Sequence, residues 1–185
     1  VKNEVDHWSD EKQQCAAKKF TSATKTVMEK AAICLAKEHD VRLSIMLPTL
    51  MLGPMTLPSH GQKGFMSTIA RLIDGQAPSR KTAINDSISL AHIDDVAALF
   101  LAAYENPKAK GRYFAVANSW HWNDIYSTLK NLAPEIQVPK PCEGTPNTPT
   151  GFNFKRRDTL NVAMRNMPEI LSDTVAWVKT MNPYN

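Results

Sequence analysis

Apolar residues recur at two spacings along this chain, and these spacings predict alternating helices and strands. From residue 17 to 38, apolar side chains stand three and four positions apart with lysine and glutamate between them, which is the pattern of an amphipathic helix. Short apolar stretches predict strands at 41–47, 87–93 and 112–116. Strands that alternate with helices are typical of an α/β protein with at least part of a parallel sheet. Further helices are expected at 65–74, 94–103, 123–132, 159–164 and 168–180.

Local signals place the boundaries between these elements. Asp94 is expected to be the N-cap of the helix that follows the second strand, because its carboxylate can accept backbone N–H groups of the first turn. Residues 53–64 contain two prolines and three glycines and are expected to form a loop. Prolines are dense between residues 134 and 150, which predicts a long connection without a packed element. A C-terminal helical lobe is expected after it.

Composition narrows the class of protein. Apolar residues make up 43% of the chain and charged residues 22%, as in ordinary globular domains. The net charge is +4, and the basic residues are mostly interleaved with acidic ones, which argues against a nucleic-acid partner. Three widely spaced cysteines suggest neither a disulfide framework nor a thiol zinc site, so a reducing intracellular compartment, cytoplasmic or organellar, is expected. No apolar run approaches the roughly 20 residues that cross a bilayer, so no transmembrane segment is expected.

Five short motifs, in order, resemble one family. They are Trp8-Ser9-Asp10, the run from Lys25 to Ala32 (KTVMEKAA), the turn from Pro48 to Pro54, the segment His92-Ile-Asp-Asp-Val-Ala97, and Glu105-Asn-Pro followed by Gly111-Arg-Tyr113. Together they resemble the C-terminal half of an extended short-chain dehydrogenase/reductase of the dihydroflavonol 4-reductase and cinnamoyl-CoA reductase type. Each motif alone is weak, and the resemblance rests on their order and spacing.

The resemblance implies a Rossmann-type sheet with flanking helices and a small substrate lobe. Residues 1–133 would be the C-terminal half of the Rossmann-type domain with interleaved segments of that lobe, and 134–185 the proline-rich connection and helical lobe. Family members bind NADP through a Gly-rich turn near the start of the fold, and this sequence contains no G-x-G-x-x-G. We therefore expect a missing N-terminal half, or a partner chain in a larger assembly, to complete the sheet.

The resemblance also places the catalytic groups. In this family a tyrosine four residues before a lysine gives the proton to the carbonyl oxygen as hydride arrives, and the lysine lowers the tyrosine pKa. Lys25 matches the lysine, and Thr21 stands where the tyrosine would be. Threonine lacks the phenyl ring and its hydroxyl is far less acidic. Carbonyl reduction is therefore expected to be lost or impaired, unless Ser22 or Thr24 relays a proton.

The segment after the first strand is the second part of the expected site. By resemblance, Pro48, Thr49, Leu50 and Met51 form a loop whose backbone contacts the nicotinamide carboxamide. From the residues alone, the same segment reads as a plain strand exit, and Lys25 as a solvated helix lysine. Three function hypotheses remain: an impaired reductase-like protein that still binds NADP, an active NADPH-dependent carbonyl reductase, and a purely structural accessory subunit.

Three other motifs have a structural and a functional interpretation. The segment His92-x-Asp94-Asp95 could bind a metal, but Asp94 as a helix cap and His92 satisfied at a strand end is favoured. Lys155-Arg156-Arg157 could meet a phosphate or an acidic partner, and a solvated turn is favoured. Trp120-His121-Trp122 lines a substrate pocket or packs the small lobe, and the sequence does not decide between them.

Overall fold

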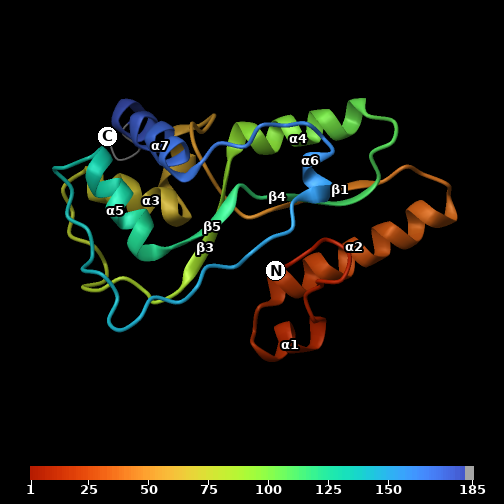
Figure 1. Ribbon diagram of the computed structural model, residues 1–185, viewed down its shortest axis with the longest axis horizontal. Coiled ribbons are helices and arrows are strands. Elements are labelled where there is room, and N and C mark those ends of the chain that lie inside the picture. The colour runs from red at the N-terminus through yellow and green to blue at the C-terminus, as the bar shows by residue number, and fades with distance from the viewer. Residues whose placement is uncertain (182–185) are drawn as a thin grey trace.

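The computed structural model describes residues 1–181, in which helices and strands alternate as the sequence predicts (Figure 1). The expected α/β class is confirmed. The elements are α1 (Glu11–Ala16), α2 (Phe20–Glu38), β1 (Ser44–Pro48), β2 (Leu50–Leu52), η1 (Pro58–Gln62), α3 (Gly64–Ile73), β3 (Ser87–His92), α4 (Ile93–Glu105), β4 (Gly111–Ala115), β5 (Asn118–His121), α5 (Trp122–Leu132), α6 (Lys155–Asp158) and α7 (Met167–Met181).

The strands form two short sheets, and the chain crosses from the first sheet to the second twice. β1 pairs in parallel with β4, with Ser44 opposite Gly111. β2 pairs in parallel with β3, and β3 pairs antiparallel with β5. The chain passes from the first sheet to the second at Thr49, between β1 and β2, and again between β4 and β5. Within residues 1–181, β1 has a strand partner along one edge only.

Two hydrophobic cores lie on these sheets. The larger core joins β2 and β3 to α3, α5 and α7, which gather at one end of the molecule (Figure 1). The smaller core joins β1 and β4 to α4, which lies along them. The segment 134–150 contains no helix and no extended strand, as its prolines predict. Its contacts with the rest of the chain include an isolated bridge between Lys140 and Thr82.

Helix α2 is unusual because little of it is buried. Only Ala23 and Thr26 are buried, whereas Phe20 and Met28 are 61% and 62% exposed. Figure 1 shows α2 with the short α1 beside it, set apart from the other helices on one side of β1 and β4. An amphipathic helix gains most of its stability by packing its apolar face. The exposed apolar residues of α2 therefore indicate a face that has no neighbour in the described part of the chain.

Several sequence-based boundaries need correction. The helix expected from residue 17 begins only at Phe20, after Lys18, whose φ of 56° lies in the left-handed region, and the short α1 before it was not expected. No helix covers 159–164; the helical turn lies earlier, at α6. β2 and β5 were not expected. They are three and four residues long, too short for alternation to show in the sequence.

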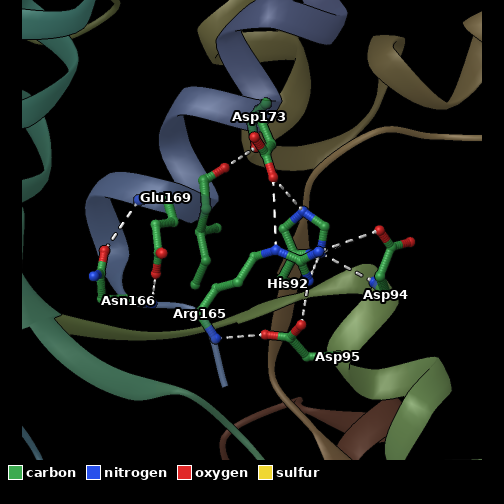
Figure 2. A network of polar contacts seen from close by, with 9 residues as sticks. His92, Asp94, Asp95, Arg165, Asn166, Glu169 and Asp173 are labelled. Atoms are coloured by element: carbon green, nitrogen blue, oxygen red, sulfur yellow. Dashed lines mark hydrogen bonds and ion pairs between the residues drawn. The ribbon is translucent and has the colours of Figure 1, made fainter. Parts of the chain in front are cut away.

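A polar network around the buried His92 joins β3, α4 and α7 (Figure 2). The His92 ring is fully buried, and its Nδ1 accepts the Asp94 backbone N–H at 3.2 Å, so His92 and not Asp94 is the N-cap of α4. The Arg165 guanidinium bonds Asp95, which is 4% exposed, and lies 3.1 Å from His92 Nδ1. From α7, Asp173 lies 3.3 Å from His92 Nε2. This network fixes the end of β3 against the C-terminal helix.

Candidate functional site

A cavity of about 700 Å³ lies between α2 and β1. Thr21 and Lys25 from α2 line it, as does Pro48 at the end of β1. The four-residue spacing places Thr21 and Lys25 one helical turn apart on the same face. The structure thus brings together three of the residues predicted from the sequence. Within residues 1–181, no carboxylate forms an ion pair with Lys25.

An arginine from β4 holds α2 at this position. Arg112 Nε donates to Glu29 Oε1 at 2.6 Å, and both side chains are largely buried, at 13% and 14% exposure. The Arg112 guanidinium also stacks on the Trp8 ring, with 3.7 Å between its central carbon and the ring centroid. Because Glu29 lies one turn after Lys25 on α2, this contact fixes the helix turn that presents the lysine.

The sequence did not predict that Arg112 contacts both Glu29 and Trp8. Its signal was present, because Trp8, Glu29 and Arg112 each lie in a different one of the five motifs. The spacing along the chain does not show that the three motifs meet. The ion pair can be recognised only in the folded structure, where β4 pairs with β1 and Arg112 reaches Glu29 of α2.

The hydroxyl groups near Lys25 are those of small residues. Ser22 lines the cavity together with Thr21, whereas Thr24 does not. Tyrosines lie elsewhere in the described residues: Tyr104 is exposed on α4, and the other two, Tyr113 and Tyr126, do not line this cavity. Tyr184 lies outside the described residues. No phenol of the described chain therefore fills the position one turn before Lys25.

The segment that follows β1 is divided by the structure. Pro48 lines the cavity, whereas Thr49, Leu50 and Met51 do not. Leu50 and Met51 belong to β2 and pair with Leu90 and Ala91 of β3. Thr49 connects the two sheets, and its Oγ1 is buried without a hydrogen-bond partner in the described part of the chain. A buried hydroxyl without a partner is costly, so this atom marks a place where a further polar group would be stabilising.

The remaining motifs have structural roles. The favoured interpretation of Lys155-Arg156-Arg157 as a solvated turn is wrong. Arg157 is 8% exposed and donates to the Val116 carbonyl at 2.6 Å, and Arg156 donates to the Arg112 carbonyl at 2.7 Å. Trp120 and Trp122 pack against the larger core. Within residues 1–181, no three His, Cys, Asp or Glu side chains are grouped in a way that could hold a metal ion.

A search for membrane-spanning helices among residues 1–181 finds none that is both long and apolar enough.

Comparison with known proteins gives one family. The profile of the NAD dependent epimerase/dehydratase family matches residues 6–117, the part that contains α2, β1 and the cavity between them. Cinnamoyl-CoA reductase 2 of Medicago truncatula is 30% identical over 172 residues, which are 91% of this chain and 50% of that protein. Dihydroflavonol 4-reductase of Zea mays is 31% identical over 144 residues, 77% of this chain and 39% of the relative.

Solved structures share the fold at low identity. Vestitone reductase from alfalfa superposes with a TM-score of 0.79 at 18% identity, covering 98% of this chain and 59% of that one. Yeast methylglyoxal/isovaleraldehyde reductase Gre2, solved with NADPH, gives a TM-score of 0.73 at 22% identity over 97% of this chain and 56% of its own. The chain spans about half the length of these curated relatives, or less.

Proposed function

This chain belongs to the NAD dependent epimerase/dehydratase family, and from that premise we propose that it is the C-terminal half of an NADP-binding reductase fold in which carbonyl reduction is lost or severely weakened. One observation carries the proposal: Thr21 and Lys25 face the same cavity one turn apart, with a small hydroxyl where the family's mechanism needs a phenol. Among residues 1–181, the cavity contains the Lys25 cation, the Glu29 carboxylate is paired with Arg112, and the hydroxyls of Thr21 and Ser22 are weak acids.

Proton transfer is the step that this arrangement performs poorly. Hydride addition to a carbonyl leaves an alkoxide that must be protonated, and a positioned acid with a pKa near the working pH accelerates such a step by roughly 10²–10⁴-fold. The Thr21 hydroxyl ionises far above that range, and its oxygen lies close to the helix backbone because the side chain is short. Ser22 lines the same cavity and is the better placed of the two alternative relays.

The cavity fits the nicotinamide end of the cofactor. Its volume of about 700 Å³ lies within the range of small-molecule sites. Lys25 would contact the nicotinamide ribose, and Pro48 would lie against the ring. When bound, NADPH would supply the hydride. The Gly-rich turn that binds the diphosphate is not part of this sequence and would come from the complementing half.

The complementing half is proposed to dock on the free edge of β1 and on α2. Unpaired strand edges are unfavourable unless they are covered or protected. Phe20 and Met28 expose apolar surface on α2 that a further layer of the fold would bury. The complementing half would be either the preceding part of a longer chain or a separate polypeptide. The exposed apolar face also favours a second candidate function, a structural subunit of a larger assembly.

The test uses this chain co-produced with the N-terminal half of a cinnamoyl-CoA reductase. NADPH oxidation is followed with ketone, aldehyde and acyl-thioester substrates, and NADPH binding by fluorescence. Thr21→Tyr is expected to react about 100-fold faster than the unmodified chain, and Thr21→Tyr combined with Lys25→Met to lose that gain. Turnover by the unmodified chain within about tenfold of Thr21→Tyr would establish an active reductase instead. Failure of both to bind NADPH, with the halves still associated, would support the structural subunit.

A further inference from the structure

Helix α4 carries apolar side chains around its whole circumference. Residues 96–104 (VAALFLAAY) form the longest uninterrupted apolar run of the chain. The side that faces the sheet is buried, with Leu99 fully covered in the smaller core. The outer side is open, because Phe100 and Leu101 are each 55% exposed and Tyr104 is 79% exposed. A helix that is apolar on all sides is normally buried on all sides. In the described part of the chain, the outer side of α4 therefore lacks the neighbour that its composition requires.

The sheet under α4 is closed at β4 and open at β1. Arg156 and Arg157 of α6 donate to backbone carbonyls along the outer edge of β4. On the same edge, the Phe114 N–H donates to the carboxylate of Glu4, which is buried. Within residues 1–181, β1 has no strand partner along its other edge. An additional strand would therefore join this sheet at β1, because the groups of the β4 edge are already bonded.

Helices α2 and α4 cover opposite faces of β1 and β4 (Figure 1). Successive side chains of a strand point to opposite faces of its sheet. Arg112 of β4 reaches Glu29 of α2, whereas Tyr113, the next residue, packs into the core that contains α4. Parallel sheets are generally covered by helices on both faces. Strands that join at β1 would therefore bring cover on the α4 face as well as on the α2 face.

The exposed flank of α4 lies on the side of β1. The segment between α6 and α7 follows the other flank, because Leu160 is buried in the smaller core and Arg165 bonds Asp95 of α4. This segment leaves α6, which is bonded to β4, so it lies on the β4 side. A helix turns by about 100° per residue, which places Phe100 and Tyr104 about 140° and 180° around α4 from Asp95. These two side chains therefore stand on the flank toward the open edge of the sheet.

We propose that a helix of the complementing half packs along this flank of α4, so that the half holds the sheet of β1 and β4 on both faces. The inference rests on the proposed function, in which the complementing half docks at β1 and α2, and it adds a second contact on the opposite face. The relatives identify the occupant, because this chain covers 50% of the cinnamoyl-CoA reductase and 39% of the dihydroflavonol reductase. A segment of at least comparable length in those proteins therefore lies outside the match. The docked helix would present apolar residues to Phe100 and Tyr104.

Hydroxyl-radical labelling can show whether this flank is covered. The chain alone is compared with the chain co-produced with the N-terminal half of the Medicago truncatula cinnamoyl-CoA reductase, and peptide mass spectrometry measures the labelling rate of each side chain. Labelling of Phe100 and Tyr104 should be lost in the complex. Ile84, which is 43% exposed ahead of β3, should keep its rate. Unchanged labelling of Phe100 and Tyr104 in a complex that forms would overturn the proposal.

Two variants measure what the flank contributes to association. Phe100→Gln and Tyr104→Gln remove apolar surface and keep a good helix former, so the isolated chain should fold as before by circular dichroism. Each is expected to weaken the affinity between the two halves about tenfold or more, measured by sedimentation. Ile84→Gln is the matched control and should leave that affinity unchanged. Equal affinities for Phe100→Gln, Tyr104→Gln and the unmodified chain would refute the proposal.

The other outcomes separate this contact from the proposed function. If Phe100→Gln weakens a complex that does not bind NADPH, the contact is upheld and the NADP-binding function is overturned. If the chain alone forms a dimer that Phe100→Gln dissociates, a second copy is the occupant and the proposal is wrong. If the unmodified halves do not associate at all, docking on both faces is overturned together.

Discussion

Gly53 is the position at which one added methyl group should disturb the fold most clearly. It follows β2 with φ of 120°, a region that L-residues rarely adopt. A Cβ at this position would lie 2.7 Å from His92 Nε2 and 3.0 Å from Cδ2 and Cε1 of the same ring. The ring cannot withdraw easily, because Asp94 and Arg165 contact its other nitrogen and it is fully buried.

The cost of Gly53→Ala has two parts. Left-handed backbone costs an L-residue about 1–2 kcal/mol, and forcing an extra carbon into a packed site costs about 1–3 kcal/mol. The free energy of unfolding should therefore fall by roughly 2–5 kcal/mol. For a chain of this size, each kcal/mol lowers the Tm by roughly 2–4 °C. The Tm of Gly53→Ala should then fall by roughly 4–20 °C.

Gly75→Ala is the matched control in a thermal melt followed by circular dichroism. Gly75 also has positive φ, 80°, but nothing lies within 4 Å of its added Cβ, so the control reports backbone strain alone. Gly53→Ala is expected to be the less stable of the two by about 1–3 kcal/mol. The difference in stability between the two variants should disappear when each glycine is replaced separately in a His92→Ala background. Equal Tm values for the two single variants would refute the steric argument.

Three further predictions follow from other contacts. Arg165→Ala leaves the buried Asp95 carboxylate without its cation and should lower the free energy of unfolding by about 3 kcal/mol in urea. Glu29→Gln removes the charge opposite Arg112 and should cost about 1.5–3 kcal/mol, with faster amide hydrogen exchange in α2. Burial raises the pKa of Tyr126 above the ordinary 10.0, and the positive charge of Arg80 acts in the opposite direction. An absorbance titration should therefore show that the Tyr126 phenolate forms at a higher pH than that of an ordinary tyrosine. Stability should fall as pH rises past 10.0, because Tyr126 loses its proton first in the unfolded chain.

Each of these three predictions has a control variant or a result that would contradict it. Lys179→Ala removes an exposed ion pair with Glu135 and should leave stability nearly unchanged; an equally small loss for Arg165→Ala would contradict the burial argument. For α2, unchanged hydrogen exchange in Glu29→Gln would show that the ion pair does not hold the helix. Tyr126→Phe should abolish the late phenolate and lessen the loss of stability above pH 10.0.

The helices and longer strands could be read from the sequence because their apolar residues recur at a fixed spacing. The residues that cap α4 and α5 could not. α4 and α5 each begin after a histidine whose Nδ1 accepts the backbone N–H two residues later, in His92-Ile-Asp94 and His121-Trp-Asn123. Histidine is not a favoured N-cap, and the ring can serve only when tertiary contacts fix its rotamer. The repeated spacing at two strand-to-helix junctions was the one available signal.

The arginines of α6 show the same limit. Three consecutive cations suggest a solvated surface, because isolated charges are rarely buried. The carbonyls of Lys110, Arg112 and Val116, in and beside β4, need donors, and Arg156 and Arg157 supply them. Whether a guanidinium reaches water or a carbonyl depends on which loop lies beside it. That information resides in the packing of distant segments, not in the local sequence.

The candidate site likewise has one part that the sequence predicts and one part that depends on tertiary packing. Thr21 and Lys25 could be related from sequence because both lie on one helix, where a four-residue spacing fixes their separation. Their surroundings depend on β1, on the Arg112 contact to Glu29, and on whatever covers the exposed face of α2. A complementing half can supply a wall, a cofactor and a dry environment, but it cannot change the distance between the Lys25 ammonium and the residue one turn before it. The absence of a phenol one turn before Lys25 is therefore a property of α2 itself, and under the proposed function the proton would have to come through Ser22 or from an acid carried by the complementing half.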